Sequence, residues 1–214
     1  MTTHDILGVK ADGRSALCQI LNQWTRTTIQ VAQTWDGIDV PWWYNERASL
    51  STLAGAVWRA GGIAFEEFSA EKLVHTARGK HRMNYSGRCD MFFEFGSREF
   101  NIEAKFGYSG GTNIGGDPRP RITGILDEAR KAAGRLPVAK EQTRLAVAFI
   151  TPYFTHKFRN HEGLMICRWI EKTQAIRCSA KAWVFPKISR RLKSEDGYYC
   201  PGAAVFVQEV KRAI

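Results

Sequence analysis

Hydrophobic residues recur at helical spacing in four stretches of the chain. The clearest stretch follows Asn45, a suitable helix N-cap, and stops at Gly61 and Gly62. Its apolar stripe comprises Leu50, Leu53, Ala54, Val57 and Trp58. The same periodicity predicts helices over residues 15–35, 122–136 and 163–175.

Other stretches have the character of strands. Residues 145–150, LAVAFI, form an unbroken apolar run that is typical of a strand buried on both faces, in the middle of a mixed sheet. Shorter patterns predict strands over residues 63–68, 182–185 and 203–210.

Two segments are expected to lack regular structure. Residues 71–86 are polar and basic, which favours a solvated connection into the next strand. Residues 107–121 are rich in Gly and Pro and are expected to form a flap that carries Arg119 and Arg121.

Residues 87–106, GRCDMFFEFGSREFNIEAKF, predict a β-hairpin around Gly96 and Ser97, because a Gly-first dipeptide suits a two-residue loop. This turn sets Phe93 opposite Phe100, Met91 opposite Ile102 and Asp90 opposite Glu103. Side chains alternate along a strand, so the apolar residues are expected on a core face. Asp90, Glu103 and Lys105 are then expected together on the other face.

Two carboxylates opposed across a hairpin repel each other, and something must offset that repulsion. Mg²⁺ would do so, because it takes oxygen ligands and is commonly held by one or two carboxylates plus substrate phosphate. Lys105 adds a cation beside these acids. Such a group can bind a metal, hold a phosphate and orient a water. The structural alternative is an ion pair between Lys105 and either Glu103 or Asp90.

Asp90, twelve intervening residues and then Glu103-Ala104-Lys105 resemble the core motif of the PD-(D/E)XK nuclease superfamily. Cys89 stands where the family's name has Pro, a position that varies in such families. The resemblance implies an α/β, restriction-endonuclease-like fold, in which helices flank a mixed β-sheet. The predicted order over residues 45–151 matches its αβββαβ core, with N- and C-terminal additions.

The resemblance also implies roles for the residues of the motif. Asp90, Glu103 and the carbonyl of Ala104 would bind Mg²⁺, for which Mn²⁺ would substitute. Lys105 would stabilise the charge that develops on the phosphate, or position the attacking water.

Glu46 lies in the first turn of the helix that follows Asn45, four residues before Leu50 and therefore on the apolar stripe. Acidic residues in a first turn commonly complement the helix dipole. Nuclease-like folds of the resembled kind often direct a helix Glu towards the metal. Glu46 is therefore either a dipole partner or a third acidic metal ligand with a catalytic role.

The length of 214 residues predicts one nuclease-like domain. Residues 1–44 would form a helical extension, 45–151 the catalytic core, and 152–214 strands and a helix that complete the sheet. The five Cys have no metal-binding spacing and are expected to be reduced thiols. We also expect a soluble, cytoplasmic protein of a prokaryote or phage, because the chain shows neither a signal peptide nor a membrane-spanning apolar run.

The formal net charge of +10 favours a polyanionic partner, since neutralising phosphates releases counterions. DNA is the expected partner, a homodimer is a further option, and no membrane is expected. The residues expected to contact the nucleic-acid backbone are Arg78, Lys80, Arg82, Arg88, Arg119, Arg121, Lys187, Arg190 and Arg191. Basic segments are also commonly no more than solvated surface.

Two functions of different class follow. The first is a Mg²⁺-dependent nuclease that hydrolyses DNA phosphodiester bonds, as an endonuclease of restriction, repair or phage type. The second is a catalytically inactive module of the same fold that binds nucleic acid or a protein partner.

Overall fold

The computed structural model describes residues 4–13, 15–75, 82–110, 116–137, 139, 141–155 and 157–211, with the backbone alone for residues 70–75 and 82–86. The strands are β1 (Ile6–Lys10), β2 (Ile63–His75), β3 (Arg82–Phe95), β4 (Arg98–Gly110), β5 (Gln142–Tyr153), β6 (Ala180–Phe185) and β7 (Ala203–Val210). The α-helices are α1 (Ala16–Thr34), α2 (Glu46–Arg59), α3 (Arg119–Ala133) and α4 (Phe158–Gln174). A short 3-10 helix, η1, spans Pro41–Trp43.

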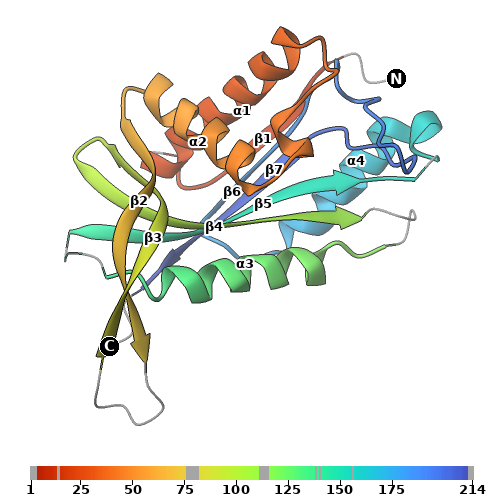
Figure 1. Ribbon diagram of the computed structural model, residues 1–214. Coiled ribbons are helices and arrows are strands. Elements are labelled where there is room, and N and C mark those ends of the chain that lie inside the picture. The colour runs from red at the N-terminus through yellow and green to blue at the C-terminus, as the bar shows by residue number, and fades with distance from the viewer. Residues whose placement is uncertain are drawn as a thin grey trace.

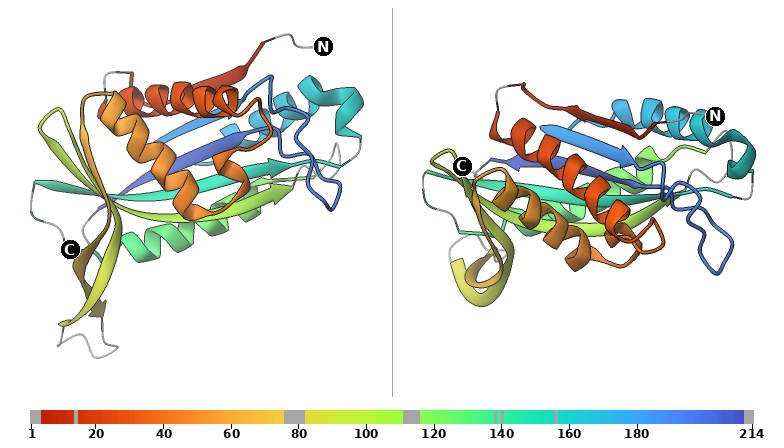
Figure 2. Two further views of the ribbon diagram at one scale, coloured as in Figure 1. Left: turned by 45° about the horizontal axis from the view of Figure 1, so that its top comes forward. Right: turned by 90° about the horizontal axis from the view of Figure 1, so that it is seen from above.

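All of these strands belong to one seven-stranded mixed sheet, in the order β1-β6-β7-β5-β4-β3-β2. The helices cover both faces: α1 and α2 lie on one side, and α3 and α4 on the other (Figures 1 and 2). The chain is therefore of the α/β class, as expected. From α2 to β5 the order is helix, three strands, helix and strand, which confirms the predicted sequence of elements.

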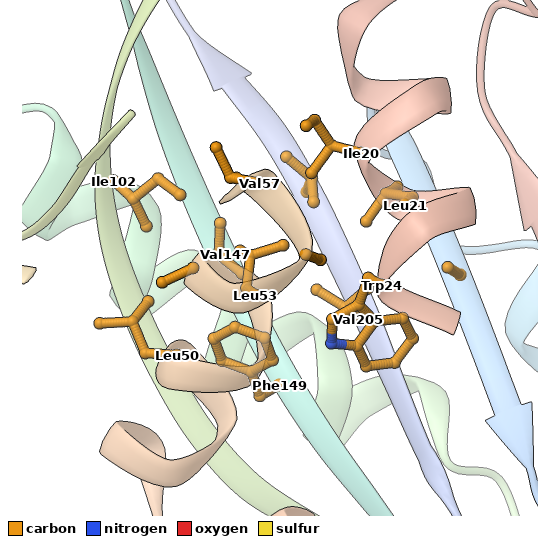
Figure 3. Close-up of a cluster of buried hydrophobic side chains, with 14 of the residues drawn as sticks. Ile20, Leu21, Trp24, Leu50, Leu53, Val57, Ile102, Val147, Phe149 and Val205 are labelled. Atoms are coloured by element: carbon orange, nitrogen blue, oxygen red, sulfur yellow. The ribbon is translucent and has the colours of Figure 1, made fainter. Parts of the chain in front are cut away.

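Each face of the sheet has its own apolar core. On the first face, Leu50 and Val57 of α2 and Trp24 of α1 belong to one cluster with Ile102, Val147 and Val205 of the sheet (Figure 3). The cluster on the second face contains Ile122, Ile125 and Leu126 of α3, Ile166 and Trp169 of α4, and Ala146, Ala148 and Ile150 of β5. β5 contributes to both clusters and lies between parallel β4 and antiparallel β7, so the prediction of a central buried strand is confirmed.

The predicted helix after Asn45 is confirmed together with its cap. The side chain of Asn45 accepts a hydrogen bond of 3.1 Å from the backbone N–H of Ala48, which satisfies one of the amides left open at the helix start. The predicted stripe is wrong at its last member, because Trp58 is 53% exposed. The first residue of this helix is Glu46, whose side chain lies where it can meet groups from the sheet.

The β3–β4 hairpin also has the predicted register. Phe93 pairs with Phe100 and Met91 with Ile102. Gly96 and Ser97 have φ values of 56° and 58°, the left-handed conformations that a tight hairpin turn of type I′ requires.

Four expectations about the elements were wrong. Residues 107–121 do not form one irregular flap, because β4 continues to Gly110 and α3 begins at Arg119. β2 continues past residue 68 to His75 and pairs with β3 from Arg82 onwards, so the described parts of residues 71–86 are strands. Glu103, which was expected on the face away from the core, is buried, with 3% exposure. Finally, β1 was not expected; it is an edge strand beside β6, and its Gly8 leaves room for the ring of Trp183.

Within the described residues, no helix is both long and apolar enough to cross a membrane.

Candidate active site at the edge of β4

The candidate site lies where β3 separates from β4. The ladder between these strands runs from the hairpin turn to the pair Met91–Ile102, whereas β4 continues beside β5 as far as Gly110. From Glu103 onwards, the edge of β4 that faced β3 therefore needs other partners for its backbone groups. Beyond this point β2 and β3 leave the sheet together as a two-stranded ribbon (Figure 1).

The pairing of β2 with β3 is interrupted at the same place. Phe68 pairs with Cys89 and Glu66 with Met91, but the ladder omits Glu67, which has a φ of 51°. Asp90 lies directly across from this break. The register predicted for the hairpin thus holds up to Met91, and the ladder ends one pair before Asp90 and Glu103.

Asp90 and Lys105 complete the hydrogen bonding of β4 at Ala104. Oδ2 of Asp90 accepts a hydrogen bond of 2.7 Å from the backbone N–H of Ala104. Nζ of Lys105 donates one of 2.6 Å to the carbonyl of the same residue. Two of the predicted site residues therefore converge on the backbone of a third.

Glu46 approaches from α2. Its Oε2 lies 3.5 Å from Nζ of Lys105, in an ion pair whose side chains are about one-third exposed, 34% for Glu46 and 35% for Lys105. The backbone N–H of Phe106, two residues further along β4 than Ala104, also acts on this carboxylate by lowering its pKa. The structure thus brings Asp90 and Lys105 to Ala104 and adds Glu46, whereas the expected group was Asp90, Glu103 and Lys105.

The pKa of Glu46 is raised above its ordinary value of 4.5. Burial is the main cause, because it disfavours the charged form. The charge of Asp90 raises the pKa further, while the ammonium of Lys105 and the hydrogen bond from Phe106 lower it in part. Two carboxylates thus face each other around a single ammonium, and additional positive charge there would stabilise both ionised forms.

Glu103 lies on the same face of β4 as Lys105, two residues before it, as the alternation of side chains predicts. Its partner in the β4–β5 ladder is Ala146, which packs in the cluster of α3 residues. The side chain is 3% exposed. Burial raises the pKa of the Cys89 thiol to about 12, and the charges of Glu103 and then Asp90 contribute. Both acids of the motif therefore lie within electrostatic range of Cys89.

The oxygen atoms at the edge of β4 would supply only part of the ligand shell of a magnesium ion. Among the described residues, no group of three or more His, Cys, Asp or Glu is arranged to hold a metal ion. Asp90, Glu46 and the carbonyl of Ala104 nevertheless form an oxygen-only set. Mg²⁺ commonly binds one or two carboxylates and completes its shell with water and substrate phosphate. Lys105 now contacts two of these three groups, so a metal would require its ammonium to move.

Three of the predicted basic residues lie on the described surface near this edge. Arg121 is the nearest to the strand: its Nη2 would lie 3.7 Å from a Cβ added to Gly107, two residues beyond Lys105. Arg119 pairs with Asp117 at 2.8 Å, and Arg88 pairs with Glu67 at 3.1 Å. Arg121 is therefore the best placed of these three to contact a phosphate at the site.

The other predicted basic residues differ in placement. Lys187 is exposed, and Arg191 pairs with Glu162 at 2.8 Å. Arg190 does not fit the predicted role, because it is 2% exposed and donates to the carbonyl of His4. Arg78, Lys80 and the side chain of Arg82 lie outside the described residues.

The structure contains a cavity of about 420 Å³ that the sequence did not predict, and aromatic side chains line it, among them Trp43, Tyr108, Tyr153 and Tyr198. The only signal was a concentration of aromatic residues around Trp43 and before Cys200. Nothing in the spacing of these residues along the chain indicates that they share one cavity.

The hydrogen bond from Ala104 to Asp90 predicts that two substitutions of Asp90 will differ in stability. Asp90→Asn retains an oxygen acceptor, whereas Asp90→Ala leaves a partly buried N–H without this partner. We expect Asp90→Ala to lower the free energy of unfolding by about 1–3 kcal/mol relative to Asp90→Asn. Urea unfolding of both variants measures the difference, and equal stabilities would contradict the structural role of Asp90.

The raised pKa of Glu46 predicts how Glu46→Gln changes stability with pH. A raised pKa in the folded state means that Glu46 stabilises the fold below its unfolded pKa, and that this contribution is lost as the pH rises through the folded pKa. Gln does not titrate. The stability of Glu46→Gln relative to wild type should therefore increase from below pH 4.5 to neutral pH.

Thermal unfolding across this pH range tests the prediction. Glu128→Gln, which removes an exposed carboxylate from α3, is the control and should show a smaller trend. A relative stability of Glu46→Gln that falls with pH would be the opposite of the expected sign.

Comparison of the chain with protein-family models finds no match, and comparisons with curated proteins and with solved structures find none either. Function is therefore inferred from the geometry around Ala104 and from the resemblance that Asp90, Glu103 and Lys105 carry.

Proposed function

We propose that this chain is a Mg²⁺-dependent nuclease of restriction-endonuclease-like fold that hydrolyses phosphodiester bonds of DNA. The observation that carries the proposal is that Asp90 and Lys105 meet at Ala104, where β3 leaves β4, and that Glu46 pairs with Lys105 there. The order of elements from α2 to β5 supports it, since it is the order that the resemblance implies. The net charge of +10 supports a polyanionic substrate.

The side chains at the edge of β4 can divide the work of hydrolysis. Asp90, Glu46 and the carbonyl of Ala104 would hold Mg²⁺, which when bound polarises the phosphate and lowers the pKa of a water. Arg121, beside Gly107, would help to orient the phosphate. Lys105 would turn from the Ala104 carbonyl towards the phosphate and stabilise the charge that develops on it.

Glu46 and Glu103 have separate places in this scheme. Burial raises the pKa of Glu46, and the positive charge of a bound Mg²⁺ would offset this effect and favour the ionised form that holds the metal. Glu103 remains a predicted ligand, buried on the face of β4 that also carries Lys105.

One observation favours the second candidate, an inactive module that binds nucleic acid or protein. Asp90 and Lys105 both bond to the backbone of Ala104, and this closes the edge of β4 without any metal. In that case Asp90 and Lys105 would serve to stabilise the fold and would have no catalytic role. Only measurements of cleavage and of metal binding separate the two candidates.

Cleavage of circular, linear and single-stranded DNA, each with millimolar Mg²⁺ and with EDTA, tests the nuclease proposal. We expect cleavage that depends on the metal, and a loss of about 100-fold or more in Asp90→Asn and Lys105→Met, because each removes a charged group from the transition state. Glu94→Gln is the matched control, since Glu94 is an exposed acid on the same strand as Asp90. Undiminished cleavage by Asp90→Asn would refute the assignment of the site.

Melting temperatures measure metal binding independently of cleavage. A cation that binds only the folded state raises the melting temperature by mass action, so wild type should melt higher with Mg²⁺ than with EDTA. Asp90→Asn should lose most of this increase, and it should be at least as stable as wild type in EDTA because the repulsion with Glu46 is relieved.

Lys105→Met is the informative partner in this experiment. It should keep the increase with Mg²⁺, because the ammonium competes with the metal for Glu46 and the Ala104 carbonyl. The inactive module predicts no increase in either variant or in wild type. An equal increase in Asp90→Asn and wild type would show that the metal binds elsewhere.

A further inference from the structure

The aromatic cavity lies beside the candidate active site. It has a volume of about 420 Å³ and is lined by Trp43, Tyr108, Tyr153 and Tyr198, with Asp196 as a charged member. This volume is within the range of pockets that bind small organic groups. The four rings come from η1, from the ends of β4 and β5, and from the connection between β6 and β7.

The cavity and the candidate site share two segments of the chain. Tyr108 follows Lys105 on β4 by three residues, which is about 10 Å along a strand. Trp43 precedes Glu46 by three residues. The hydroxyl of Tyr108 donates a hydrogen bond of 2.7 Å to the carbonyl of Trp43, which ties these two segments together at the cavity wall.

The opposite wall is held in place before any ligand binds. Residues 194–198 form a tight turn, in which the backbone N–H of Ser194 donates to the carbonyl of Tyr198 at 2.8 Å and Gly197 has a φ of 87°. The ring of Tyr198 lies edge-on to that of Tyr153, with centroids 5.3 Å apart. The indole N–H of Trp42 donates to the carbonyl of Cys200 at 3.1 Å and so anchors this connection to η1.

The rings are nevertheless open to solvent in part. Tyr108 is 41% exposed and Tyr198 is 40% exposed, so the preformed cavity presents aromatic surface that a planar group could cover. Asp196 offers only hydrogen-bond acceptors, and nucleobases carry N–H donors on their edges. Lys193, exposed at the start of this turn, would favour an adjoining phosphate.

We propose that this cavity binds an unpaired nucleobase of a nucleic-acid strand whose backbone crosses the candidate active site. The base would stack on the tyrosine rings, and the adjacent phosphates would extend towards Lys105. The substrate would then be single-stranded nucleic acid, or a duplex with a base turned out of the stack. The inference rests on the proposed nuclease function for the direction of the strand, but the base site can be measured without cleavage.

A binding experiment in EDTA separates the two proposals. The probes are a fluorescein-labelled single-stranded oligonucleotide and a fully paired hairpin of equal length, and affinity is measured by anisotropy at one fixed salt concentration. We expect tighter binding of the single strand. Stacking of one base on an aromatic side chain predicts that Tyr198→Ala weakens single-strand binding by about 5- to 150-fold, with little change for the hairpin.

Two further variants control for folding and for the choice of tyrosine. Tyr198→Phe keeps the ring and should bind like wild type. Tyr44→Ala removes a tyrosine that is 54% exposed and lies next to Trp43 but does not line the cavity, so it should also bind like wild type. A single strand that contains 2-aminopurine should lose fluorescence on binding wild type, and lose less on binding Tyr198→Ala, because the loss reports stacking.

Each result decides one proposal. Equal weakening of single-strand and hairpin binding in Tyr198→Ala, or no weakening at all, would overturn the base site. Displacement of the oligonucleotide by a small quaternary ammonium ion alone would do the same, since it would identify a cation-binding cage. Specific single-strand binding without any Mg²⁺-dependent cleavage would leave the base site standing and refute the nuclease.

Discussion

The structure around the candidate site depends on the departure of β3 from β4. A sheet edge that loses its neighbour has backbone N–H and C=O groups that need other partners. Here Asp90 accepts from the N–H of Ala104, Lys105 donates to its carbonyl, and Glu46 forms an ion pair with Lys105. The charged side chains are thus held in place by the hydrogen-bonding needs of β4 itself.

The departure has a local cause in the β2–β3 ribbon. Two-stranded ribbons twist more strongly than wide sheets, and this one is interrupted at Glu67, whose left-handed backbone breaks the ladder opposite Asp90. The stacked rings of Phe93 and Phe100, with centroids 4.5 Å apart, hold β3 on β4 just before the separation. Cys89 then packs against Leu136 beyond α3. The break is therefore fixed on both sides, which gives Asp90 a defined position.

The sequence predicts those parts of the fold that local rules determine. Gly96 and Ser97 specify the turn, and alternation of side chains then gives the register of Phe93 and Met91. The same rules cannot show where two paired strands part, because that depends on twist and on what packs beneath them. They also cannot show that Glu103 is buried, or that Arg190 is buried near His4, since both follow from contacts between distant segments. The sequence therefore indicated Asp90, Ala104 and Lys105 as site residues, but it could not predict that both side chains bond to the backbone of Ala104.

The net charge of the site is opposite in sign to the net charge of the whole chain. Asp90 and Glu46, when ionised, outweigh the single ammonium of Lys105, so the site carries one negative charge within a protein of net charge +10. Interactions between exposed charges are screened beyond about 8 Å at physiological ionic strength. A divalent cation that reaches the edge of β4 is therefore attracted mainly by the nearby carboxylates. A polyanion that approaches from solution is attracted mainly by the basic surface. A metal bound between the two would reverse the local sign and draw a phosphate towards Lys105, so that metal and nucleic acid should bind cooperatively at this edge.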